Sequence, residues 1–195
     1  MKKNKKTGLY FGSFNPIHIG HMAIANYMIE FTDLEELWFV ISPQNPFKTN
    51  EQLLNDYDRL ELLKIAINND PRFDICDIEF YLPRPSYTID TLIYLEERYK
   101  NRKFILIMGS DNLPQFHKWK NYKIIEEKYE RYVYPRPGYE NVNYNIHKNI
   151  KIFNAPLMDI SSTFIREAIR QKKDIRYFLP HGVYEEIDKM NYYRI

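Results

Sequence analysis

The chain has 195 residues, of which 44% are hydrophobic and 28% are charged. These values are typical of globular proteins and exclude a disordered or collagen-like chain. At a norm of about 150 residues per domain, the length predicts a single domain over residues 1–195. The formal net charge of +2 excludes the strongly basic surface that is typical of nucleic-acid partners.

The N-terminal residues 1–6 carry four lysines, enough to begin a signal peptide. Gly8, Gly12 and Pro16 then interrupt the apolar run, so we expect a flexible basic end instead. No window approaches about 18 uncharged apolar residues, so neither a membrane span nor a membrane partner is expected. The single cysteine, Cys76, excludes an internal disulfide and favours a reducing compartment, which predicts a cytoplasmic protein.

Short apolar runs alternate with amphipathic segments along the chain. The pattern predicts strands over residues 7–11, 37–41, 73–81, 104–108, 132–134 and 150–153, and helices over 19–31, 56–68, 88–99, 122–129, 161–171 and 183–190. Residues 109–119 are expected to form a loop with a short helical turn. Continuous apolar strands between helices indicate an α/β fold with a doubly wound parallel sheet, whose ligands bind beyond the carboxyl ends of the strands.

The segment after the first expected strand reads GSFNPIHIGH over residues 12–21. His18 and His21 fall three residues apart in the first turn of the following helix and therefore on one face. The free N–H groups and the dipole of a helix start favour a phosphate, and imidazoles add donors that are neutral or cationic near pH 7. A metal site is the weaker interpretation because no third ligand is nearby, and no Gly-Lys-Ser/Thr of a Walker A loop follows.

A second helix start of this kind spans residues 160–166, with the sequence ISSTFIR. Ser161 or Ser162 can cap the helix, and Arg166 lies one turn inside it, where a guanidinium can hold phosphate oxygens. Taken alone, the segment is also typical of an ordinary cap followed by a surface cation. Two helix starts suited to binding phosphate, both expected at the same sheet, favour the interpretation as a phosphate-binding site.

With both segments in view, the sequence resembles the HxGH nucleotidyltransferases, most closely the bacterial nicotinate-nucleotide adenylyltransferases. Residues 12–21 and 160–166 resemble motifs shared across that superfamily, and the resemblance extends from Leu9 to Tyr193. Three further segments resemble the narrower family: PSYTIDTL at 85–92, IMGSD at 107–111 with Trp119 after it, and RPGY at 136–139. Where the family often has Pro-Pro-His-Lys, residues 43–48 read PQNPFK, which keeps Lys48 but lacks the histidine, and Lys120 replaces a frequent Tyr.

The resemblance implies a Rossmann-like fold and adenylyl transfer from ATP to nicotinate mononucleotide, with Mg²⁺ accompanying ATP and no protein-bound metal. It implies catalytic roles for His18, His21 and Arg166. The implied ATP-binding residues are Gly12, Ser13, Phe14, His18, His21, Lys48, Gly109, Asp111, Ile160, Ser161, Ser162 and Arg166. The implied nicotinate-mononucleotide-binding residues are Ser13, Lys48, Tyr87, Thr88 and Trp119.

Simpler roles remain open for several of these residues. Asp111 can merely cap a turn, Trp119 can belong to the core, Thr88 can be only a helix cap, and Lys48 can be a solvated cation. Other activities also remain open: adenylyl transfer to nicotinamide mononucleotide, to phosphopantetheine or to another phosphorylated acceptor, and nucleotide sensing without turnover. The oligomeric state is not indicated.

Overall fold

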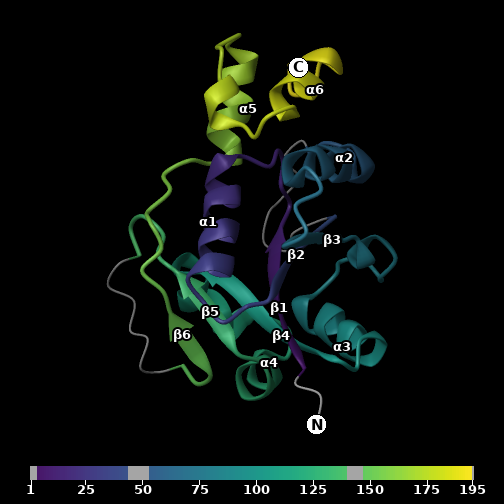
Figure 1. Cartoon of the computed structure of the whole chain (residues 1–195), viewed down its shortest axis with the longest axis vertical. Helices are drawn as coiled ribbons and strands as arrows, with labels where there is room; N and C mark the ends of the chain where they lie inside the picture. Colours follow the sequence, from purple (N-terminus) through teal and green to yellow (C-terminus); the bar gives the residue numbers. More distant parts are fainter. Residues whose placement is uncertain (1–3, 44–52, 140–146, 195) are drawn as a thin grey trace.

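Six parallel strands form one sheet in the order β3-β2-β1-β4-β5-β6 (Figure 1). The structure is a computed structural model that describes residues 4–43, 53–139 and 147–194. The strands are β1 (Lys5–Gly12), β2 (Glu36–Ile41), β3 (Phe73–Cys76), β4 (Arg102–Gly109), β5 (Arg131–Tyr134) and β6 (Ile150–Ile152). This order confirms the doubly wound parallel sheet. The direction of winding reverses between β1 and β4, where such sheets bind ligands.

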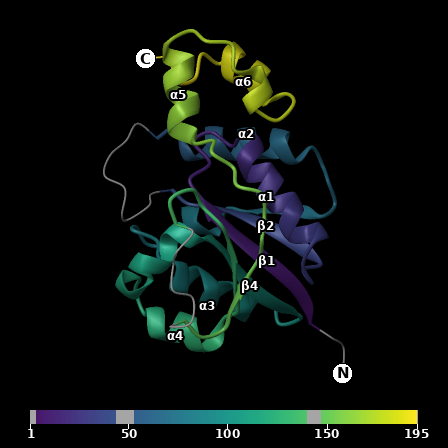
Figure 2. The ribbon, with the colours of Figure 1, turned by 90° about the vertical axis from the view of Figure 1, so that its left-hand side faces the viewer.

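Helices cover both faces of the sheet. They are α1 (Ile19–Glu30), α2 (Asp56–Ile67), α3 (Thr88–Arg98), α4 (Tyr122–Lys128), α5 (Ser162–Arg170) and α6 (Val183–Lys189), with 3-10 turns η1 (Ile78–Phe80), η2 (Ser110–Lys118) and η4 (Arg176–Phe178). One core lies between the sheet and α1, α2, α5 and α6, and the other between the sheet and α3, α4 and η2. Figure 2 shows α1 and α3 on opposite sides of the strands.

The central strands feed both cores because successive side chains of a strand point to opposite faces. In β4, Ile105 and Ile107 enter the first core, whereas Leu106 and Met108 enter the second. All four are buried. This two-sided burial explains why residues 104–108 are continuously apolar, as expected for the interior of a parallel sheet.

Two sequence-based expectations about the extents of the strands and of the N-terminal end are wrong. The strand expected over residues 73–81 ends at Cys76, because the backbone N–H of Phe80 donates to the carbonyl of Asp77 and closes the turn η1. The flexible end expected over residues 1–6 does not include Lys5 and Lys6. These two lysines begin β1, and their side chains form ion pairs with Glu36 and Asp33.

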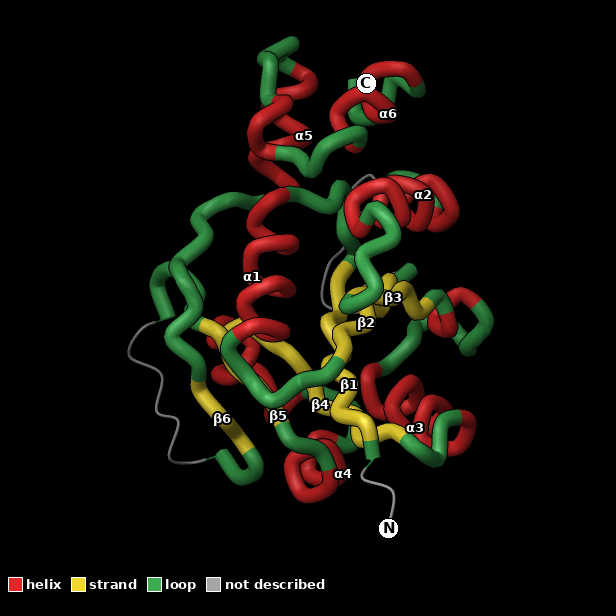
Figure 3. The backbone as a smooth tube through the Cα atoms, viewed as in Figure 1, coloured by secondary structure: helices red, strands yellow, loops and turns green. Residues whose placement is uncertain are grey.

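The C-terminal helices α5 and α6 lie together at one end of the molecule, opposite the end at which β1 begins (Figure 1). A long irregular segment leads from β6 to α5 and is drawn as a loop in Figure 3. It delivers the start of α5 to the carboxyl end of the sheet. Within the described residues, no helix is both long enough and apolar enough to cross a membrane.

Candidate active site

Two cavities open at the carboxyl ends of β1 and β4. The histidine cavity, of about 570 Å³, is lined by His18 and His21. The tryptophan cavity, of about 390 Å³, is lined by Trp119. Both volumes fall in the range of about 300–1,000 Å³ that is usual for small-molecule sites. The two cavities share Tyr10, Phe11, Gly12, Ser13, Asp111, Asn112 and Tyr134. Two ligands bound in them would therefore meet above the end of β1.

The two histidines stack at the start of α1. His18 is the N-cap, His21 is three residues on, and their ring centroids are 3.7 Å apart. The backbone N–H of His18 lies 3.3 Å from Nδ1 of His21 and donates to it. Because Nδ1 accepts this bond, a neutral His21 carries its proton on Nε2, which is then a hydrogen-bond donor. The expected placement of both imidazoles at this helix start is confirmed.

His18 is more buried than the sequence suggests, with 3% of its surface exposed. Desolvation, with a smaller contribution from the charge of Arg136, lowers the pKa of His18 to about 3. Of the two forms expected for an imidazole near pH 7, neutral and cationic, His18 takes the neutral one. Its ring lies against Gly20, where an added Cβ would be 3.0 Å from Nδ1. A larger residue at this position would push the ring by a few tenths of an ångström, so the glycine leaves the ring its place.

The start of α5 is bonded to the loop between β1 and α1. Ser161 is the N-cap and accepts a hydrogen bond from the backbone N–H of Phe164 at 3.1 Å. The hydroxyl of Ser162 donates to the carbonyl of Pro16 at 2.9 Å. Arg166 is 7% exposed and donates to the carbonyl of Asn15, so the alternative interpretation of Arg166 as an ordinary surface cation is wrong. Its guanidinium both lines the cavity and holds the loop.

The histidine cavity gathers nearly all the residues that the resemblance assigns to ATP. Those lining it are Gly12, Ser13, Phe14, His18, His21, Asp111, Ile160, Ser161, Ser162 and Arg166. Gly109 instead lines the tryptophan cavity. Lys48 lies outside the described residues. Two helix starts, α1 and α5, thus open onto one cavity that also holds a guanidinium, which makes it suited to a polyanion.

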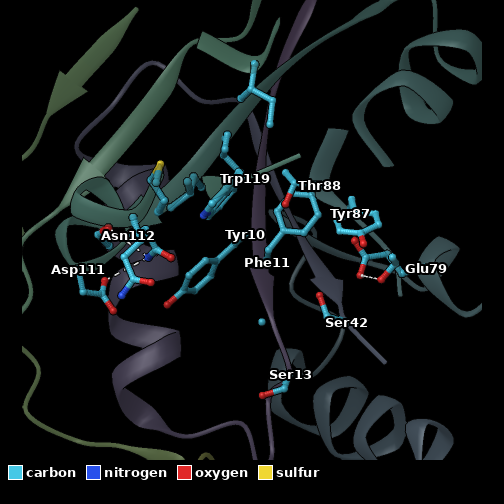
Figure 4. A pocket seen from close by; sticks show the side chains of 18 of the residues that line it. Tyr10, Phe11, Ser13, Ser42, Glu79, Tyr87, Thr88, Asp111, Asn112 and Trp119 are labelled. Atoms are coloured by element: carbon cyan, nitrogen blue, oxygen red, sulfur yellow. Dashed lines mark hydrogen bonds between the residues drawn. The ribbon is translucent and has the colours of Figure 1, made fainter. Parts of the chain in front are cut away.

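The tryptophan cavity gathers the residues that the resemblance assigns to the mononucleotide. Ser13, Tyr87, Thr88 and Trp119 all line it (Figure 4). The N-cap of α3 is Tyr87 rather than Thr88, so the interpretation of Thr88 as a mere cap is wrong. Trp119 packs against Phe116 with centroids 5.5 Å apart and still borders the cavity, so it is not confined to the core. This pocket offers an aromatic face beside a helix start.

Comparison with known proteins agrees with this geometry. A family model described as cytidylyltransferase-like matches residues 9–168. A protein of Cytophaga hutchinsonii is 52% identical over 188 residues, covering 96% of this chain and 98% of the relative. One of Bacteroides fragilis is 50% identical, covering 93% and 90%. Both are called "Probable nicotinate-nucleotide adenylyltransferase".

The chain belongs to the nicotinate-nucleotide adenylyltransferase family. A solved structure of Plasmodium falciparum nicotinic acid mononucleotide adenylyltransferase complexed with NaAD has a TM-score of 0.82. It is 21% identical and covers 97% of both chains. At that identity the likeness shows a shared fold.

The site contains a further residue, Arg136, to which the sequence alone assigned no role. Arg136 follows β5 in the RPGY segment and lines the histidine cavity, with Nε 4.0 Å from Oδ2 of Asp111. A Cβ added at Gly109 would lie 2.8 Å from Arg136 and 2.3 Å from Asp111. Gly109 therefore makes room for this charged pair. The signal was available in the motif, since Arg-Pro-Gly directly follows a strand.

Two buried charged residues near the site, Arg59 and Glu79, were not predicted from the sequence. Arg59 is fully buried in α2 and donates to the backbone carbonyls of Ser13 and Ser42, which follow β1 and β2. An ion pair with Asp56 at 2.6 Å compensates its charge. Glu79, in η1, is also buried and lines the tryptophan cavity. Single charged residues in a helix or turn are normally exposed, so nothing in the sequence marked them.

In the part of the chain that the structure describes, no three His, Cys, Asp or Glu side chains are grouped so as to hold a metal ion. Asp111 does place a carboxylate where the two cavities join. A magnesium ion held mainly by phosphate oxygens and water needs no more than one or two such carboxylates. The residues present therefore fit a cation that enters with a nucleotide.

Proposed function

We propose that this chain transfers the adenylyl group of ATP to nicotinate mononucleotide, giving deamido-NAD and pyrophosphate. The observation that carries the proposal is the pair of joined cavities at the β1–β4 switch point. One is suited to a polyanion and the other has an aromatic face beside a helix start. The names of relatives about half identical over nearly the whole chain support the same activity.

The reaction is an in-line displacement at the α-phosphorus of ATP. A phosphate oxygen of the mononucleotide forms the new bond to that phosphorus, the bond to the bridging oxygen breaks, and pyrophosphate leaves with the electron pair. A phosphate is already a competent nucleophile, so the protein need not supply one. Its work is to position two anions and stabilise the charge that moves to the leaving oxygen.

The histidine cavity would hold ATP. Neutral His18 and the Nε2–H of His21 would donate to the α-phosphate and the leaving oxygen, with the dipole of α1 behind them. Arg166, with Ser161 and Ser162, would bind the outer phosphates, and the resemblance gives Lys48 a similar role. Asp111 would accept from a ribose hydroxyl. Mg²⁺, held by phosphate oxygens and water, would supply further charge neutralisation to ATP.

The tryptophan cavity would hold the mononucleotide. Trp119 would stack on the pyridine ring, and the backbone N–H groups of Tyr87 and Thr88 would donate to the ring carboxylate. An amide in that position would present its own NH₂ to these donors and leave polar groups unpaired. We therefore expect nicotinate mononucleotide to be preferred over nicotinamide mononucleotide.

The deciding experiment measures pyrophosphate release from MgATP with a panel of acceptors. We expect the highest kcat/KM with nicotinate mononucleotide. A higher value with nicotinamide mononucleotide or phosphopantetheine would reassign the acceptor. Nucleotide binding without pyrophosphate release from any acceptor would make the protein a sensor.

A further inference from the structure

Glu79 is a buried carboxylate at the edge of the tryptophan cavity. It is 2% exposed and has no ion-pair partner among the described residues. It accepts hydrogen bonds from hydroxyls instead: Ser86 to Oε2 and Thr91 to Oε1, both at 2.8 Å. The side chain of Ser42 is a third partner. Burying a carboxylate costs free energy unless the group is hydrogen-bonded. The three hydroxyls supply the hydrogen bonds that offset this cost.

The bonds to Glu79 bracket the acceptor-binding segment. Ser86 immediately precedes Tyr87 and Thr88, and Thr91 lies in the next turn of α3. Both ends of this short segment are therefore fixed to one carboxylate on a separate element, η1. Figure 4 shows Glu79, Tyr87, Thr88 and Ser42 together on one side of β1, with Asp111 and Asn112 on the other.

The hydroxyl protons of Ser86 and Thr91 are directed at Glu79. The backbone N–H groups of Asp90 and Thr91 donate to the carbonyl of Tyr87. The donors that the start of α3 still offers to a ligand therefore include the backbone N–H groups of Tyr87 and Thr88. Burial raises the pKa of Glu79, and the three hydroxyl donors oppose this shift. The hydroxyls therefore favour the charged form of Glu79, and the carboxylate in turn fixes the direction in which these hydroxyls donate.

We propose that Glu79 is the positioning residue for acceptor specificity: it fixes residues 86–91 so that the backbone N–H groups of Tyr87 and Thr88 face the carboxylate of the bound pyridine ring. This inference rests on the proposed function and deepens it. Glu79 acts through the segment and not by touching the reacting phosphates. Its removal should therefore change recognition of the acceptor and leave recognition of ATP unchanged.

The test is Glu79→Gln, which keeps the shape but turns one acceptor oxygen into an NH₂ donor. The hydroxyl that faces this NH₂ must then accept a hydrogen bond instead of donating one. The segment also loses its hydrogen bonds to a charged carboxylate. We expect the KM and the calorimetric Kd for nicotinate mononucleotide to rise about tenfold or more. The KM for ATP should change less than about twofold, and the preference for acid over amide should shrink by a similar factor.

Thr91→Val removes one donor while keeping the side-chain shape, and should give the same changes in smaller degree. Glu96→Gln is the matched control. Glu96 is an exposed carboxylate of the same helix that accepts from the hydroxyl of Tyr129 at 2.8 Å, away from both cavities. Its replacement should leave both KM values and the acceptor preference unchanged.

An unchanged acceptor Kd, or KM values for both substrates that rise together, would overturn the role of Glu79. Loss of folding in both Glu79→Gln and Thr91→Val, seen by circular dichroism, would overturn it too and assign the cluster to stability. Failure of the proposed function is a separate result, because it appears in the unaltered protein as no turnover of nicotinate mononucleotide with MgATP.

Discussion

The guanidinium of Arg166 donates from Nη1 to the backbone carbonyl of Asn15 at 2.9 Å, across 151 positions of the chain. The bond joins the start of α5 to the loop that follows β1. Arg166 is buried beside the histidine cavity that it lines. One side chain thus contributes both to ligand binding and to the shape of the loop that carries the histidines.

Arg166→Lys separates charge from geometry, because an ammonium lacks the fork that reaches both a phosphate and a carbonyl. We expect the KM for ATP to rise roughly tenfold and kcat to fall. The melting temperature should drop by roughly 2–8 °C, for a loss of about 1–2 kcal/mol. Steady-state kinetics and thermal denaturation measure these changes. Arg170→Lys, at an exposed position one turn later, is the control, and equal behaviour of the two variants would contradict the assignment.

His21→Ala removes a donor that acts on charge developing in the transition state. We expect kcat to fall by roughly 10²–10³, with little change in the KM for ATP. The measurement is steady-state kinetics with circular dichroism to confirm folding. His117→Ala, an exposed histidine that lines neither cavity, should keep normal kinetics. A folded His21→Ala protein with near-full kcat would favour the sensor.

Gly20→Ala tests the close approach of the His18 ring to the backbone of α1. The new Cβ, 3.0 Å from Nδ1, would displace the ring and its stacking on His21. Misplacement on this scale lowers kcat by roughly ten- to a hundredfold. Gly20 lies in the first turn of α1, where the gain in helix propensity is smaller than the value of about 1 kcal/mol for a helix interior. This gain opposes the strain, so the melting temperature should change little. Ala23→Gly, at an exposed position of the same helix, should instead lower stability and preserve kcat.

The buried His18 predicts how stability depends on pH. Unfolding restores the ordinary pKa of 6.5, whereas the folded protein holds this pKa near 3. Between these values the unfolded chain binds the extra proton, so the free energy of unfolding decreases as pH falls. The slope from one such group is at most about 1.4 kcal/mol per pH unit. Denaturant titrations between pH 6.5 and 4 should show a shallower slope for His18→Gln than for the unaltered protein. Equal slopes in the two proteins would mean that the pKa of His18 is not lowered by folding.

Local patterns predicted much of the fold and the site. The paired histidines and the Ser161 cap depend on spacings of three residues within one helix turn, which a sequence displays directly. Buried strands such as β4 can be predicted from their continuous runs of apolar residues.

What the sequence could not indicate depends on distant partners. Arg59 is buried because carbonyls 46 and 17 positions away surround its guanidinium. Glu79 is buried because three hydroxyls from other segments turn toward it. The strand expected over 73–81 failed for a related reason: its alternation continued past Cys76, but the backbone bonds of η1 replaced the ladder.

Asn15 joins parts of the chain that are synthesised at very different times. Its side-chain oxygen accepts from the backbone N–H of Leu54 at 3.1 Å and from the hydroxyl of Tyr193 at 2.9 Å, the latter 178 positions downstream. Arg166 supplies a further bond to its carbonyl. During synthesis on the ribosome, the loop that carries the histidines therefore cannot form all its hydrogen bonds until Arg166 and Tyr193 have been added to the chain. A nascent chain can form β1 and α1 early, yet it acquires the finished loop only after synthesis reaches Tyr193.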